Sequence, residues 1–235
     1  MQQGIEVPPE IVQKWQKIVN LLAEIMHVPS ALIMKVEPPN IKVLVSSESK
    51  SNPYEPGEVA CLNTGLYCET VMKTRQPLLV PDALADQDWK SNPDVKLGMI
   101  SYLGFPIAWP DGEIFGTICV LDHKRNEYSE LYRKLLPQFR DVLQADLKSL
   151  ATQHAQLTTQ KAHLEELFAR VPEAIVLVDD GGRVVRANPE FTNIFGYPES
   201  EVLGRSLNDL IVPEELRAEA REKTRGTEHE RKPKL

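Results

Sequence analysis

The stretch 103-LGFPIAWPDGEIFGTICVLD-122 decides the fold of this chain. Residues 100–109 and 114–121 are apolar, β-branched or aromatic, and the Pro-Asp-Gly-Glu segment between them is typical of a tight turn. We therefore expect an antiparallel hairpin at the centre of a sheet. Gly104 and Gly116 lie inside its strands, where glycine often marks a bulge, the close approach of a ligand or another backbone, or relief of crowding against a packed helix.

Shorter predicted elements precede this hairpin. Residues 10–26 carry apolar side chains at spacings of three and four, which predicts an amphipathic helix. Two β-type runs follow at 31–36 and 41–46, and a short helix at 66–74 precedes a brief strand at 78–80. This order predicts an α+β fold in which helices flank an antiparallel sheet.

The composition is ordinary for a globular protein and excludes several classes of function. The 235 residues are 42 % hydrophobic and 26 % charged with a formal net charge of −7, so we expect no nucleic-acid partner. No apolar run approaches the roughly 20 residues that span a bilayer, and residues 1–9 lack the regions of a signal peptide. The three cysteines form no CxxC pair, which indicates reduced thiols and a cytoplasmic protein.

A long helix is predicted from residue 126 to 170, and we expect Pro137 to kink or restart it. Leucine recurs along it every seven residues, at Leu136, Leu143, Leu150, Leu157 and Leu164. Four residues after each come Arg140, Leu147, His154, Lys161 and Phe168. These heptads predict a coiled-coil seam that joins two copies in register as a homodimer. The alternative is a helix that packs against its own domain.

The segment after the long helix changes character. Residues 174–179 and 184–187 read as two strands joined by a tight Asp-Gly-Gly-Arg turn, and Asn188 opens short helical pieces. The chain is charged after residue 214, with few apolar residues after Leu216. A segment as short as the one that follows the long helix buries too little surface to form a stable domain on its own. We therefore expect an incomplete domain.

Two family resemblances follow from these residues. Glu69 to Asp82, Leu103 to Ile107 and Gly116 to Asp122 together resemble a GAF domain, which would cover residues 8–145. The most specific part is the hairpin that reads G-x-P-I followed by G-T-I-C-V-L-D.

The second resemblance lies behind the long helix. Leu164 to Phe168, Pro172 to Ile175, Ala187 to Pro189 and the Gly196-Tyr197 pair resemble the N-terminal half of a PAS domain. A complete PAS domain is longer, and its last three strands find no counterpart after Leu216.

These resemblances imply a domain order and a role. We expect a GAF sensory domain at 1–128, a signalling helix at 129–168 and a partial PAS domain at 169–235. Such modules in bacteria precede an output domain, such as a histidine kinase of a two-component system or a diguanylate cyclase. The chain carries no motif of those outputs, so we expect a non-catalytic sensory input module whose output domain lies downstream.

A GAF domain holds its ligand between the sheet and the helices and loops over one face, which places the predicted pocket within residues 66–103. Apolar walls with a few polar groups suit a small molecule. The candidate ligand-binding residues are Cys68, Glu69, Asp82, Trp89, Tyr102 and Trp109. For each of these residues the alternative to ligand binding is a structural role. For Asp82 that role is to cap a turn. The sequence names neither the ligand nor a cofactor.

Two further functions stay open. Some GAF relatives reduce free methionine sulfoxide with cysteines, which would require a reactive Cys68 and a partner such as Cys61, whereas Cys119 reads as a small buried residue. The second further function is that of a dimerisation scaffold that binds no ligand. Bilin attachment is disfavoured because Glu69, and not a histidine, follows Cys68, and His27 and His123 lack the spacing of metal ligands.

Overall fold

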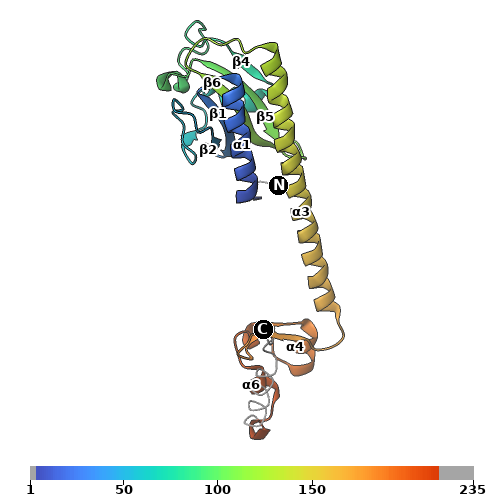
Figure 1. Ribbon diagram of the computed structural model, residues 1–235. Helices are drawn as coiled ribbons and strands as arrows, with labels where there is room; N and C mark the ends of the chain where they lie inside the picture. Colours follow the sequence, from blue (N-terminus) through green and yellow to red (C-terminus); the bar gives the residue numbers. More distant parts are fainter. Residues whose placement is uncertain (1–3, 217–235) are drawn as a thin grey trace, which may run out of the picture. The chain divides into compact units, whose positions relative to one another are not determined.

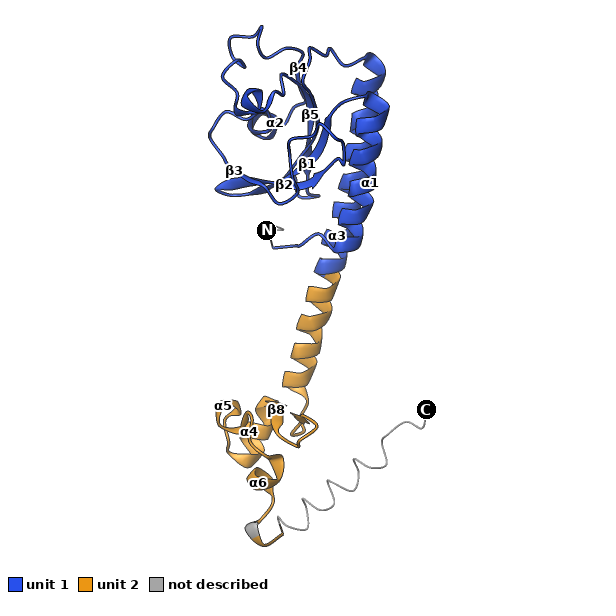
Figure 2. Cartoon of the chain, turned by 60° about the vertical axis from the view of Figure 1, so that its left-hand side comes forward, with its two compact units in different colours: residues 1–155 blue, residues 156–235 orange. Residues whose placement is uncertain are grey.

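The computed structural model describes residues 4–216, and the chain forms two compact units, residues 1–155 and 156–235 (Figure 2). The first unit therefore extends into the long helix, beyond the boundary at residue 128 that the sequence predicts. Each unit has its own hydrophobic core.

The first unit is built on a six-stranded antiparallel sheet (Figure 1). Its strand order is β3-β2-β1-β6-β5-β4, so the predicted hairpin of β5 and β6 lies near the middle, as expected. The strands are β1 (Ser30–Glu37), β2 (Asn40–Ser46), β3 (Val59–Cys61), β4 (Leu78–Val80), β5 (Ser101–Ala108) and β6 (Ile114–Asp122).

Gly116 allows the two central strands to pair. It lies opposite Lys35 in the ladder between β1 and β6, and a Cβ atom at this position would come 1.7 Å from the backbone oxygen of Met34. A side chain would therefore force the two backbones apart. This confirms the close backbone approach that a glycine inside a strand predicts.

Helices cover the sheet and divide the interior into two cores. Helices α1 (Pro9–Met26) and α3 (Glu130–Arg170) lie side by side on one face (Figures 1 and 2), whereas α2 (Tyr67–Thr74) and the 3₁₀ helix η1 (Pro93–Leu97) belong to the other. On the first face the buried side chains of α1 and α3 pack on the sheet, and they include Trp15, Val19, Leu22, Leu136, Leu143 and Leu147.

Helix α3 runs as one element through Pro137, so this proline does not restart it. The structure corrects the dimer seam over the first half of this helix. Leu136, Leu143 and Leu147 are fully buried in the chain's own core, so the prediction that they face a partner is wrong. A seven-residue leucine spacing fits packing on a neighbouring helix and sheet as well as a coiled coil.

The second half of the seam is accessible. Leu157 and Leu164 are 65 % and 66 % exposed, His154 and Lys161 are exposed, Leu150 packs partly against the first core and Phe168 is half-buried.

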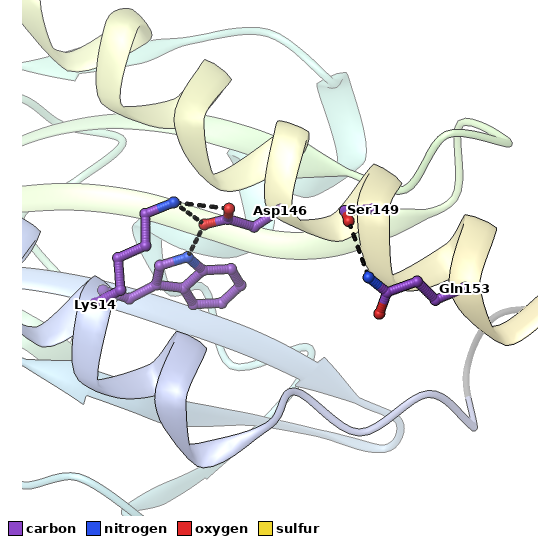
Figure 3. A network of polar contacts seen from close by, with 5 residues as sticks. Lys14, Asp146, Ser149 and Gln153 are labelled. Carbon is purple, nitrogen blue, oxygen red and sulfur yellow. Dashed lines mark hydrogen bonds and ion pairs between the residues drawn. The ribbon is translucent and has the colours of Figure 1, made fainter.

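A partly buried polar contact holds α1 against α3. Asp146 of α3 accepts hydrogen bonds from the Lys14 ammonium at 2.7 Å and from the Trp15 indole nitrogen at 2.9 Å (Figure 3). Trp15 is fully buried, so Asp146 satisfies a donor that water does not reach. Two residues earlier in α3, Gln144 accepts a hydrogen bond from the backbone N–H of Ala108 at the end of β5. These contacts join α3 to α1 and to the sheet.

The second unit contains a two-stranded antiparallel sheet and short helices. Asn188 organises it, because its side-chain oxygen accepts from the backbone N–H groups of Ile175 and Phe191. Arg186 pairs with Glu165 and lies 4.6 Å from the centre of the Phe168 ring, which ties the end of α3 to β8. The elements are β7 (Val176–Val178), β8 (Val184–Ala187), α4 (Pro189–Phe195), α5 (Glu199–Val202), α6 (Leu207–Ile211) and η2 (Glu214–Leu216).

The prediction of an incomplete domain depends on residues after Leu216, which lie outside the described part of the chain. Over residues 4–216, none of the helices combines the length and the apolar character that a membrane span requires.

Replacing Asp146 by Ala should destabilise the first unit by about 1–3 kcal/mol, because the buried Trp15 N–H loses its acceptor. The matched change Lys14→Ala removes only a partly exposed ion pair and should cost about 0–1 kcal/mol. Urea unfolding followed by tryptophan fluorescence measures both, since Trp15, Trp89 and Trp109 all lie in this unit. An equal loss of unfolding free energy in the two variants would contradict the role of Asp146 as the acceptor for Trp15.

Candidate functional site

A cavity of about 360 Å³ lies on the α2 side of the sheet. This volume falls within the range of small-molecule sites. Strand residues of β1, β2 and β6 form an apolar wall, and residues of β3, β5, α2, η1 and the loop before β3 complete it. The lining residues are Leu32, Met34, Val43, Tyr54, Glu58, Val59, Ala60, Leu66, Cys68, Pro93, Asp94, Leu97, Tyr102, Cys119 and Leu121.

Cys68 is the centre of a buried polar cluster in this cavity. It lies in the first turn of α2, and its sulfur accepts a hydrogen bond from the Thr117 hydroxyl at 3.3 Å and contacts the Tyr102 hydroxyl at 3.5 Å. Hydrogen bonding from Cys119, followed by that from Thr117 and Tyr102, lowers the pKa of Cys68. Burial raises the pKa of Cys119 well above its ordinary value. Both thiols are free.

The Tyr102 ring lies directly over Gly104. A Cβ atom at Gly104 would come 2.0 Å from the Tyr102 hydroxyl oxygen and 2.4 Å from the ring carbon that bears it. Glycine is therefore required for Tyr102 to lie along the strand with its hydroxyl on Cys68. On its other side, the Tyr102 ring stacks on Tyr67 with the ring centres 4.9 Å apart.

A second polar group, Tyr54 and Asp94, lies in the same wall. The Tyr54 hydroxyl donates to the Asp94 carboxylate at 2.8 Å. Burial raises the pKa of Asp94 above its usual range, and the hydrogen bond from Tyr54 opposes that shift. Asn92 caps η1 through the Asp94 backbone N–H and donates to the Gly65 carbonyl at 2.7 Å. Asp94 is thus held in a fixed position.

Of the candidate ligand-binding residues, Cys68 and Tyr102 line the cavity, whereas the others have different contacts. Glu69 accepts hydrogen bonds from the backbone N–H groups of Asn63 and Thr64. Asp82 accepts from the backbone N–H of Leu84, which is its predicted capping role.

The two tryptophans are likewise packing residues. Trp89 packs on Tyr67 with ring centres 5.3 Å apart. Trp109 lies in the core on the opposite face of the sheet, edge-on to Phe115 at 5.6 Å. Trp109 therefore cannot contact a ligand in this cavity, and its assignment to the pocket is wrong. Its position follows from strand periodicity, because an odd spacing of seven residues puts Tyr102 and Trp109 on opposite faces.

Sequence reasoning missed Tyr54 and Asp94. The sequence Asn92-Pro93-Asp94 is typical of the start of a helical turn. It predicts a helix cap at this point, but it does not show which side chain lines a cavity. The cysteine pairing considered from the sequence is also different in the structure. Cys61 is exposed and Cys68 is buried, whereas Cys119 lines the cavity together with Cys68.

Residues 10–156 match the GAF domain family, and they make up more than half of the chain. The chain belongs to the GAF domain family. Residues 162–234 match the PAS fold, so a PAS fold follows the GAF domain, as the sequence predicts. A comparison with curated proteins finds no match.

Solved structures carry the same GAF fold. The phycoerythrobilin-bound GAF domain from a cyanobacterial phytochrome has a TM-score of 0.54 at 13 % identity, covering 62 % of this chain and 89 % of that one. The GAF domain from an Acinetobacter phosphoenolpyruvate-protein phosphotransferase has a TM-score of 0.50 at 17 % identity, covering 67 % and 90 %. At these identities the likeness concerns the fold alone.

Within residues 4–216, no group of three His, Cys, Asp or Glu side chains is arranged to hold a metal ion. The polar groups that line the GAF cavity are two thiols, two tyrosine hydroxyls and two carboxylates, Glu58 and Asp94, and the rest of the wall is apolar.

Proposed function

We propose that this chain is the sensory input module of a signalling protein, in which the GAF cavity binds a small molecule and α3 relays the bound state to the PAS fold and an output domain. The observation that carries this proposal is the partly open apolar cavity with fixed polar groups from four separate segments of the chain. A wall of this kind suits a specific small-molecule ligand better than it suits a scaffold, which needs no such space.

The central strands provide a physical route from the cavity to α3. In β5, Tyr102 faces the cavity, whereas its neighbour Leu103 belongs to the core that packs on α1 and α3. In β6, Cys119 faces the cavity and Ile118 and Val120 face that core. A ligand that moves either strand therefore changes the surface on which α3 packs.

The affinity of the ligand limits how far binding can shift the arrangement of α3. A ligand shifts an equilibrium between two helix arrangements only by its differential affinity for them, and coupling of about 1–3 kcal/mol is typical. The hydrogen bond from Ala108 to Gln144 joins the end of β5 to α3 and supports the same direction of transmission.

We also propose that two copies pair along the second half of α3. Leu157 and Leu164 are exposed apolar residues there, and they continue the heptads beyond the part of the helix that is buried in its own domain. Lys161, a polar residue at an a position, favours a defined register at some cost in stability. We further propose that the output domain is a histidine kinase or a diguanylate cyclase and that the protein is cytoplasmic.

A second candidate is a sulfoxide reductase, which the two thiols in one cavity favour. Cys68 would take the oxygen of the sulfoxide, which releases methionine and leaves a sulfenic acid on Cys68. Cys119 would then displace water from that sulfenic acid to form a disulfide, and an external thiol reductant would reduce the disulfide. The burial that raises the pKa of Cys119 works against its resolving role. Turnover of methionine sulfoxide that Cys68→Ser abolishes would distinguish this enzyme from a sensor.

Filling the cavity should abolish ligand binding. Ala60 lines the cavity from β3, so Ala60→Trp places an indole in the ligand space, whereas Cys61→Trp on the same strand changes an exposed residue outside the lining. In a thermal-shift screen of metabolites and cyclic nucleotides, a compound that raises the melting temperature of the wild type by several degrees should leave Ala60→Trp unchanged.

The Cys61→Trp variant should respond to that compound like the wild type. An equal response of Ala60→Trp, or the lack of any response in the wild type across the screen, would contradict a ligand-binding role for the cavity.

Charging the exposed seam should separate the two copies. The double variant Leu157→Lys/Leu164→Lys buries two ammonium groups in any paired seam and should weaken dimerisation at least tenfold in sedimentation velocity. The control Gln156→Lys/His163→Lys introduces lysines at neighbouring exposed positions of the same helix and should leave dimerisation unchanged. A wild-type chain that stays monomeric at high concentration would refute the seam.

A further inference from the structure

The charge of the cavity wall restricts the class of ligand. Among the described residues that line the cavity, Glu58 and Asp94 are acidic and none is Lys, Arg or His. An anion that enters would leave water without meeting a cationic partner, and it would lie near two carboxylates. Phosphates, carboxylates and cyclic nucleotides therefore fit this wall poorly.

The hydroxyl groups in and behind the cavity wall already have hydrogen-bond partners. The single O–H of Tyr54 donates to Asp94, and burial keeps that hydroxyl protonated by raising its pKa far above the ordinary value. The Thr117 hydroxyl donates to Cys68, whose sulfur also contacts the Tyr102 hydroxyl. The wall thus offers a ligand a carboxylate acceptor more readily than a hydroxyl donor.

Asp94 is the acceptor that a ligand would meet. It is 8 % exposed, and Tyr54 occupies only one of its two carboxylate oxygens in the contacts described. Burial without a cation makes its ionised form costly, which is why its pKa is raised. A cationic N–H group beside it would stabilise the ionised form, and a charge-assisted hydrogen bond of this kind is stronger than a neutral one.

We propose, on the basis of the ligand role proposed above, that the cavity selects a small apolar or aromatic amine, whose cationic nitrogen binds Asp94 while its apolar part contacts Leu32, Val43 and Leu121. The volume of about 360 Å³ accommodates a bicyclic aromatic ring with a short side chain. The fixed position of Asp94, set by Asn92 and Tyr54, reduces the ordering that binding requires.

Three probes with one ring system test this selectivity on the full chain by isothermal titration calorimetry at neutral pH. Tryptamine is a cation, indole is neutral and indole-3-acetate is an anion. Tryptamine should bind at least tenfold more tightly than indole-3-acetate. Asp94→Asn keeps the shape and the acceptor for Tyr54 but loses the charge, so it should reduce this preference to less than threefold.

The control Asp88→Asn removes the same charge from an exposed site outside the cavity and should leave the preference intact. Binding of indole-3-acetate as tight as that of tryptamine overturns the amine selectivity but leaves the cavity a ligand site. Binding of none of the three also overturns it, and the Ala60→Trp comparison then decides separately whether the cavity binds any ligand. An unchanged preference in Asp94→Asn overturns the role of Asp94.

Discussion

The close pairing of β1, β6 and β5 is the constraint on which the rest of this structure depends. Gly116 lets the β6 backbone approach Met34, and Gly104 leaves the space that the Tyr102 ring occupies. The three strands therefore form a partition one residue thick. Its alternate side chains belong to the ligand cavity on one side and to the packing surface of α1 and α3 on the other.

The elements of the fold were predictable because their signals are local. Continuous runs of apolar, β-branched and aromatic residues, the Pro-Asp-Gly turn and the helical spacing of residues 10–26 predict β5, β6 and α1 within a few residues of their observed bounds. The close backbone approach at Gly116 was predictable for the same reason, whereas the Tyr102 ring beside Gly104 comes from the same strand and was not predicted. Strand order and the division into two cores came only from the structure.

The site was only partly predictable, because its residues meet through tertiary structure. Tyr54 and Asp94 are 40 positions apart, and nothing local to either indicates the other. The ambiguity of α3 has a different cause. Leucines at every seventh residue satisfy both intramolecular packing and a coiled coil, so the sequence cannot divide the helix where burial of Leu136, Leu143 and Leu147 gives way to exposure of Leu157.

The proposed signal passes from the cavity through β5 and β6 to α3. Hydrogen–deuterium exchange of the wild-type chain, with and without a compound that binds in the cavity, measures this most directly. We expect altered protection in β5 and β6 and also in residues 130–151 of α3, on the far side of the sheet. Changes confined to α2, η1 and the loops around the cavity would contradict it.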